Sequence, residues 1–181
     1  MNQQEKREVA VKAKKGLGAK EIILIAVLLA AGAVLKFFVG SIVNIGGMKP
    51  NFIIAMYCLA ILLVRPRIYE SVIIGILAGA VCQLFPATPY VNFASETIGA
   101  LVMGLLIFVP MNVKKFSLQP IVSTFLTTVV SGSIFAGITL VVTQAEKSAI
   151  AAYVPIVFFT AVFNAVIVQV LYLPLAKVLK K

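Results

Sequence analysis

The sequence NIGGMKPN, residues Asn44 to Asn51, is a polar, glycine-rich segment that separates two long hydrophobic runs. Its paired glycines allow backbone conformations that other residues avoid, and Pro50 has a fixed φ that suits the first turn of a following helix. If the two runs cross a membrane, the cation Lys49 and the amide Asn51 are costly at its boundary unless a polar partner receives them. The segment is therefore either a tight turn with an interfacial lysine or a loop that binds a ligand.

The composition on both sides of this segment is typical of an integral membrane protein. Of 181 residues, 61% are hydrophobic and 12% are charged, and the mean hydropathy is +1.08. Soluble domains are about 45–50% apolar and about 25% charged. The net charge of +10 indicates orientation in a membrane rather than nucleic-acid binding, because no basic helix or aromatic-interleaved patch accompanies it.

Apolar runs predict an all-α integral membrane protein with six transmembrane helices. These runs are about Glu21–Val39, Pro50–Val64, Tyr69–Phe85, Ser95–Val109, Pro120–Val142 and Tyr153–Ala176. One span needs roughly 20 residues, so the spans use nearly all of the chain and leave no room for an extramembrane domain. The shorter runs, with about 15 apolar residues, reach only about 22 Å of a roughly 30 Å hydrocarbon core.

The positions of the cations predict the orientation of the helices. With the N-terminus in the cytoplasm, all but three of the 16 lysines and arginines lie on the cytoplasmic side, and the three exceptions are Lys36, Lys49 and Lys147. The positive-inside rule then places both termini in the cytoplasm, with residues 1–20 as a basic tail. A cleaved signal peptide is the alternative for the N-terminus, but the apolar run that continues to Val39 is longer than the usual about 7–15 residues.

Small and hydroxyl residues form stripes on several predicted helices. Ala26, Ala30 and Ala33 share one face of the first helix, and Gly75 and Gly79 form a GxxxG pattern on the third, which favours close helix packing. On the fifth helix one face carries hydroxyl groups, which normally turn inward in lipid; these belong to Thr124, Thr127, Thr128 and Ser131.

Polar residues that are costly inside a bilayer gather at one level in this topology, toward the outer face. They are Lys36, Asn51, Gln83, Glu96, Ser131 and Asn164. The loops Asn44–Lys49 and Pro86–Asn92 would cover them. This pattern predicts a polar pocket open to the outside rather than a channel lined from end to end.

The residue types in this pocket suit a zwitterion with a hydrophobic side chain. Lys36 or Lys49 could bind a carboxylate, and Glu96 could accept hydrogen bonds from an ammonium group. Phenylalanines could surround an aromatic body, namely Phe37, Phe38, Phe93, Phe135, Phe158, Phe159 and Phe163. The alternative is a structural ion pair between Lys36 and Glu96 among ordinary membrane aromatics.

Catalytic chemistry has little support in the sequence. There is no histidine, and the two cysteines, Cys58 and Cys82, lie inside apolar runs, where we expect free, structural thiols. We therefore expect neither an enzyme nor a bound metal or cofactor. The chain has no GxxxxGK[ST] phosphate loop, so a partner would have to supply ATP hydrolysis if transport is primary.

The stretch GGMKPNFIIAM, residues 46–56, followed after one helix by Arg65-Pro66, resembles the tryptophan-transporter family. The resemblance continues through Leu84-Phe85-Pro86, Ser131-Gly132 and Asn164 and covers roughly residues 22–181. That family is similar to the substrate-binding S components of energy-coupling-factor (ECF) vitamin transporters. The resemblance implies a six-helix subunit that binds substrate from outside and joins a module of two ATPases and a transmembrane coupling protein.

In similar proteins a small-residue AxxxA motif on the first helix contacts the coupling protein, and Ala26 to Ala30 match that motif. An intramolecular contact is the alternative use of these alanines.

From these features we expect residues 21–181 to form an uptake protein of a prokaryotic plasma membrane, specific for tryptophan or a related aromatic compound or vitamin. The expected substrate-binding residues are Lys36, Lys49, Asn51, Glu96, Ser131, Phe135 and Asn164. Two alternatives stay open: a stand-alone, ion-coupled secondary transporter of an aromatic amino acid, and a structural or regulatory membrane protein without a saturable ligand.

Overall fold

The computed structural model describes residues 16–42, 50–113, 116–146 and 148–179. These residues form six helices, one for each predicted apolar run, and a small antiparallel hairpin of two strands. The helices are α2 (Ala19–Ile42), α3 (Ile53–Val64), α4 (Ile68–Cys82), α5 (Val91–Leu106), α6 (Gln119–Val142) and α7 (Ala149–Leu179), and the strands are β1 (Asn112–Val113) and β2 (Phe116–Ser117). Strands of two residues are too short for an alternating pattern, so hydropathy does not predict them.

Three helix starts differ from the prediction by three or more residues, and one of them is that of α7, which begins at Ala149 rather than Tyr153. Pro50 is not in the first turn of a helix, because α3 begins only at Ile53, whose backbone N–H donates to Asn51 Oδ1 at 3.3 Å. Helix α5 begins at Val91 rather than Ser95, so the loop before it ends at Tyr90. The prediction was wrong here because Asn92 was read as a loop residue, whereas its side chain binds Glu96 one turn later in the same helix.

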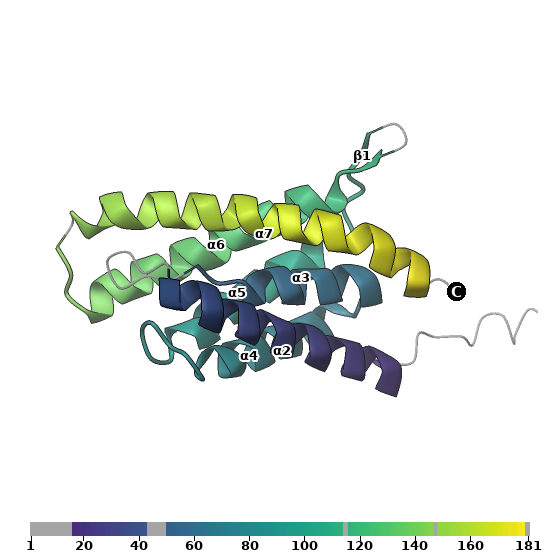
Figure 1. Ribbon diagram of the computed structural model, residues 1–181, viewed down its shortest axis with the longest axis horizontal. Coiled ribbons are helices and arrows are strands. Elements are labelled where there is room, and N and C mark those ends of the chain that lie inside the picture. Colours follow the sequence, from purple (N-terminus) through teal and green to yellow (C-terminus); the bar gives the residue numbers. More distant parts are fainter. Residues whose placement is uncertain (1–15, 43–49, 114–115, 147, 180–181) are drawn as a thin grey trace, which may run out of the picture.

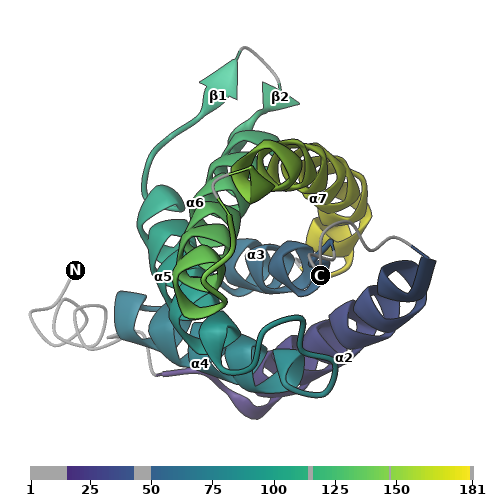
Figure 2. The same ribbon diagram turned by 90° about the vertical axis from the view of Figure 1, so that its left-hand side faces the viewer.

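Helix α3 lies at the centre of the bundle. Residues 53–62 are at most 2% exposed, and α3 contacts all five other helices. Figure 2 shows these helices surrounding α3. A helix that is apolar on every face belongs in such a position, because it has no polar side to turn toward water. The buried thiols Cys58 and Cys82 are both free, as expected.

Helices α4 and α5 pack with their backbones close together. A Cβ atom added to Gly75 would lie 2.7 Å from Ala100 Cβ and 2.7 Å from the backbone oxygen of Glu96. At Gly79 it would lie 2.9 Å from the Cα atom of Phe93. The GxxxG prediction is therefore confirmed, and these glycines hold the helix that carries Glu96 directly against α4.

The start of α2 and the end of α7 lie at the same end of the molecule, which we call the terminal end (Figure 1). The end of α2 and the α4–α5 and α6–α7 connections lie at the opposite end, the far end. At the terminal end, Gln119 accepts a hydrogen bond from Arg65 Nη2 at 3.0 Å and donates to the backbone oxygen of Ile107 at 2.8 Å. These bonds join the ends of α3 and α5 to the start of α6.

The surface of the bundle is apolar, as in a membrane protein. Three helices are long and apolar enough to cross a bilayer, and they expose large side chains such as Val27 (60%), Phe159 (63%) and Val170 (63%). Extensive exposed apolar surface marks contact with lipid or a partner. Helices α3, α4 and α5 have only 12, 15 and 16 residues. Full spanning by these three helices, and the cytoplasmic position of both termini, stay predictions.

Candidate functional site

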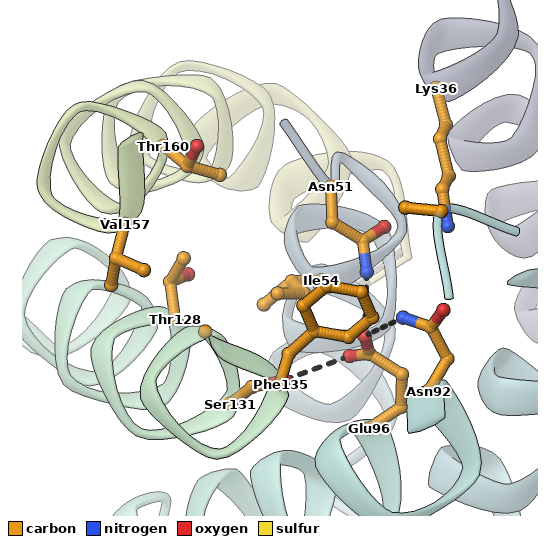
Figure 3. A pocket seen from close by; sticks show the side chains of 12 residues that line it. Lys36, Asn51, Ile54, Asn92, Glu96, Thr128, Ser131, Phe135, Val157 and Thr160 are labelled. Atoms are coloured by element: carbon orange, nitrogen blue, oxygen red, sulfur yellow. Dashed lines mark hydrogen bonds between the residues drawn. The ribbon is translucent and has the colours of Figure 1, made fainter. Parts of the chain in front are cut away.

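The carboxylate of Glu96 is the centre of a buried polar cluster near the far end. Glu96 lies on α5 and is 1% exposed. Its Oε1 atom accepts hydrogen bonds from Asn51 Nδ2 at 2.6 Å and Asn92 Nδ2 at 3.2 Å, and its Oε2 atom accepts from Ser131 Oγ at 3.1 Å (Figure 3). A buried carboxylate is unfavourable without partners, and three donors to one carboxylate reduce that cost.

Asn51 is held in place from two sides. Its Oδ1 atom accepts from the backbone N–H of Ile53, which fixes the side chain at the start of α3. Its backbone oxygen accepts from Asn164 Nδ2 of α7 at 3.1 Å, and the same amide lies 3.4 Å from Thr128 Oγ1 of α6. Asn164 is completely buried, so α3, α6 and α7 meet at this amide and orient Asn51 toward Glu96.

Lys36 faces the same cluster from α2. It is 4% exposed and lines a cavity together with Asn51, Asn92, Glu96 and Ser131. Figure 3 shows its side chain extending from α2 toward the cluster. The hydrogen-bond partners of the Glu96 carboxylate are two amides and a hydroxyl. The ammonium group of Lys36 and the carboxylate of Glu96 thus border the cavity from different helices, α2 and α5.

The cavity has a volume of about 30 Å³. A cavity needs about 10–15 Å³ to hold one water molecule, so this space admits one or two waters or a single charged group. A whole amino acid does not fit in it without movement of the walls.

The predicted hydroxyl face of α6 is confirmed and continues beneath the cavity. Ser131 and Thr128 line the cavity, and Thr124 and Thr127 follow toward the terminal end; all four side chains are at most 1% exposed. The hydroxyl of Tyr57, at the centre of the bundle, also lies against Ser131, because Gly99 leaves room for both. On its α6 side, the Glu96 cluster is therefore bordered by buried hydroxyl groups.

Most of the predicted site residues come together in the structure. Lys36, Asn51, Glu96, Ser131 and Phe135 all line the cavity, and Asn164 supports it from outside by its bond to Asn51. The prediction for Lys49 falls outside the described residues. Gln83, placed at the same level by its position, instead holds the α4–α5 turn by accepting from the backbone N–H of Tyr90 at 3.0 Å.

Several predicted aromatic residues lie elsewhere. Phe37 stacks against Phe85, with their ring centroids 4.8 Å apart, and Phe158 packs against Phe125 at 6.0 Å. Both Phe37 and Phe158 are about half exposed and do not line the cavity. The two alanines of the AxxxA motif, Ala26 and Ala30, are exposed on α2, whereas Ala33 of the same stripe is buried.

Several cavity residues are missing from the predicted set, and two of them, Asn92 and Thr160, are polar side chains that belong to no predicted feature of the site. Asn92 precedes Glu96 by four residues on α5, and Thr160 precedes Asn164 by four residues on α7. Residues four apart lie on the same face of a helix, so this spacing could have identified both. Asn92 Oδ1 is buried and has no hydrogen-bond partner among the described residues, which leaves an acceptor beside the Glu96 carboxylate.

No group of three or more histidine, cysteine, aspartate or glutamate residues within the described part of the chain is arranged to hold a metal ion. The described residues that line the cavity include one ammonium group, on Lys36, and one carboxylate, on Glu96.

Comparison with known proteins gives consistent relatives. The model of the family described as "Tryptophan transporter TrpP" matches residues 18–180. A protein of Clostridium acetobutylicum named probable tryptophan transport protein is 29% identical over 168 residues, which cover 89% of this chain and 94% of that protein. A Bacillus subtilis protein of the same name is 27% identical over 156 residues, covering 84% of this chain and 88% of the relative.

No solved structure matches the chain significantly. The family model covers nearly all of the described residues, including every helix and the whole Glu96 cluster. The chain therefore belongs to the tryptophan transporter TrpP family.

Proposed function

We propose that this chain is the substrate-binding membrane subunit, or S component, of an ECF-type importer in a bacterial plasma membrane, and that it takes up tryptophan or a related small aromatic compound. The observation that carries the proposal is the burial of Lys36 and Glu96, at 4% and 1% exposure, on one cavity. Ionisable residues inside membrane proteins are costly and are typical of substrate sites.

The arrangement of charges favours a zwitterion over a simple cation or anion. The Glu96 carboxylate and the free acceptor Asn92 Oδ1 suit an ammonium group, and the Lys36 ammonium suits a carboxylate. The opposite charges of Lys36 and Glu96 balance each other, so a ligand with only one charge would give the buried site a net charge, which is unfavourable. The α-amino and α-carboxyl groups of an amino acid satisfy both.

The role of a partner is supported by the sequence and by the surface of α2. The chain has no phosphate loop of its own, and uptake against a gradient needs an energy source. Ala26 and Ala30 expose small side chains on α2, where a neighbouring helix can approach closely. This is the face that an ECF coupling protein would contact.

Replacing both Ala26 and Ala30 by tryptophan is expected to abolish co-purification of the coupling protein and ATPases while leaving tryptophan affinity within about twofold. The bulky side chains would separate the two helices without reaching the cavity, which Ala26 and Ala30 do not line. Val154→Trp on the exposed surface of α7 is the matched control and should leave assembly intact. Unchanged assembly of the double variant would refute the proposed contact.

The substrate is tested by titrating the purified chain with L-tryptophan and then with a panel of amino acids and vitamins. The chain contains no tryptophan, so ligand fluorescence can be followed without protein background. Saturable tryptophan binding is the expected result. Binding of a vitamin instead would keep the subunit type but overturn the substrate, and absence of any binding would overturn the proposal.

Replacing Lys36 by methionine is expected to weaken tryptophan binding at least tenfold and to leave tryptamine binding unchanged or stronger. Methionine keeps the apolar stem but removes the ammonium group that would receive the carboxylate, which tryptamine lacks. Lys20→Met, on an exposed position of the same helix, is the control. Equal losses for tryptophan and tryptamine would show that Lys36 supports the fold rather than the carboxylate.

A further inference from the structure

A second, larger cavity adjoins the Glu96 cavity near the far end. Its volume is about 460 Å³, within the range of about 300–1,000 Å³ found for small-molecule sites. It is bordered by the end of α2 at Val39, by Pro50 and Phe52 ahead of α3, and by Phe159 and Phe163 of α7. The walls are almost entirely apolar, and the cavity is open at the surface of the bundle, where Phe159 and Phe163 are 63% and 62% exposed.

The two cavities share one lining residue. Thr160 of α7 lines both of them. Neighbouring residues in the sequence also line different cavities. Asn51 lines the polar cavity and Phe52 the apolar one, and Val157 lines the polar cavity and Ile156 the apolar one. A ligand that displaces the Thr160 side chain would therefore reach both spaces.

The polar cavity is too small for a whole amino acid. With its walls in their present positions it has about 30 Å³, room for a single charged group, so the side chain of a bound amino acid would lie in another space. The larger cavity has room for a bicyclic ring, and it offers Phe52, Phe159 and Phe163 for edge-to-face or offset contacts.

We propose that the cavity between the end of α2 and α7 is the ring subsite, in which the indole of the substrate lies while its charged groups reach Glu96 and Lys36 past Thr160. This inference rests on the function proposed above and adds the location of the aromatic part. It also assigns recognition of the charged groups to the Glu96 cavity and recognition of the ring to the larger cavity.

The test is to fill the ring subsite without touching the polar cavity. Ala152 lines the larger cavity only, so Ala152→Phe would occupy part of the space intended for the indole. We expect its Kd for tryptophan to rise at least tenfold. The matched control is Ala151→Phe, which adds the same volume at an exposed neighbouring position and should stay within about twofold of the parent chain.

A second variant keeps the test independent of folding defects. Phe163 is 62% exposed, so Phe163→Ala removes a cavity wall with little effect on the core. It should improve binding of 5-benzyloxytryptophan relative to tryptophan at least fivefold, because the substituent gains the vacated space. In the parent chain, bound tryptophan should show blue-shifted indole emission, as expected for a ring in apolar surroundings.

The outcomes separate this inference from the proposed function. If the parent chain binds tryptophan and Ala152→Phe binds it equally well, the ring lies elsewhere and the cavity is a lipid site, while the proposed function stands. If the parent chain binds no tryptophan, the proposed function itself fails. Unchanged ligand preference in Phe163→Ala would likewise contradict the ring subsite.

Discussion

Replacement of Glu96 by glutamine is expected to weaken tryptophan binding on the order of 100-fold. Removing one member of a buried, hydrogen-bonded charge pair costs about 2–5 kcal/mol, and about 2.7 kcal/mol corresponds to a factor of 100 in Kd. Glutamine has nearly the same shape and still accepts hydrogen bonds through its carbonyl oxygen, so the contacts from Asn51 or Ser131 can persist. The loss is measured by titration with the fluorescent ligand.

The specificity of this effect is checked with a ligand that lacks the amine. Indole-3-propionate presents the ring and the carboxylate only, so its affinity for Glu96→Gln should be unchanged or higher than for the parent chain. Glu146→Gln, at an exposed position after α6, is the control for loss of a carboxylate and should bind tryptophan normally. Parallel losses for both ligands would mean that Glu96 serves only to hold the helices together.

Replacement of Gly75 by alanine is expected to lower the free energy of unfolding by about 1–3 kcal/mol, the usual range for an overpacked contact. The added methyl group would lie 2.7 Å from Ala100 Cβ and 2.7 Å from the backbone oxygen of Glu96. Helices α4 and α5 would have to separate, and Glu96 would move with its helix. Thermal unfolding in detergent should therefore show a lower midpoint together with weaker tryptophan binding.

Gly137→Ala on α6 provides the opposite expectation. No atom lies within 4 Å of a Cβ placed there, and alanine favours a helix over glycine by about 1 kcal/mol. This variant should be as stable as the parent chain or more stable. If Gly75→Ala melts at the same temperature as Gly137→Ala, the close approach of α4 and α5 is not important for stability.

Hydropathy predicted the helices well because each apolar run is bounded by prolines, charges or glycines. The run predicted as Pro120–Val142 is helix α6, Gln119–Val142. The error at the start of α5 occurs because a polar residue lies inside that helix. Asn92 was predicted as part of a loop, yet it is 3% exposed and lies in the first turn of α5, where its side chain donates a hydrogen bond to Glu96.

For the site, the sequence predicted only that certain polar residues lie at a similar depth in the membrane. Residues at one height of a bundle, such as Lys36 and Glu96, can be grouped from topology alone, because each helix rises by a fixed amount per residue. Which of them touch depends on helix rotation and packing. The Glu96 carboxylate thus bonds to Asn51, Asn92 and Ser131, and neither these pairings nor the cavity volumes can be obtained from hydropathy.

The central helix α3 has a consequence for the biogenesis of the protein. Its 12 residues extend only about 18 Å, well short of a roughly 30 Å hydrocarbon core, and residues 53–62 expose almost no surface. Such a segment is a poor independent substrate for the insertion machinery, and its place is created only when the surrounding helices close around it. Helix α7 forms part of that wall and is synthesised after the other described helices. We therefore expect α3 to reach its buried position only after α7 has been made, and chains truncated before α7 to leave one side of α3 uncovered.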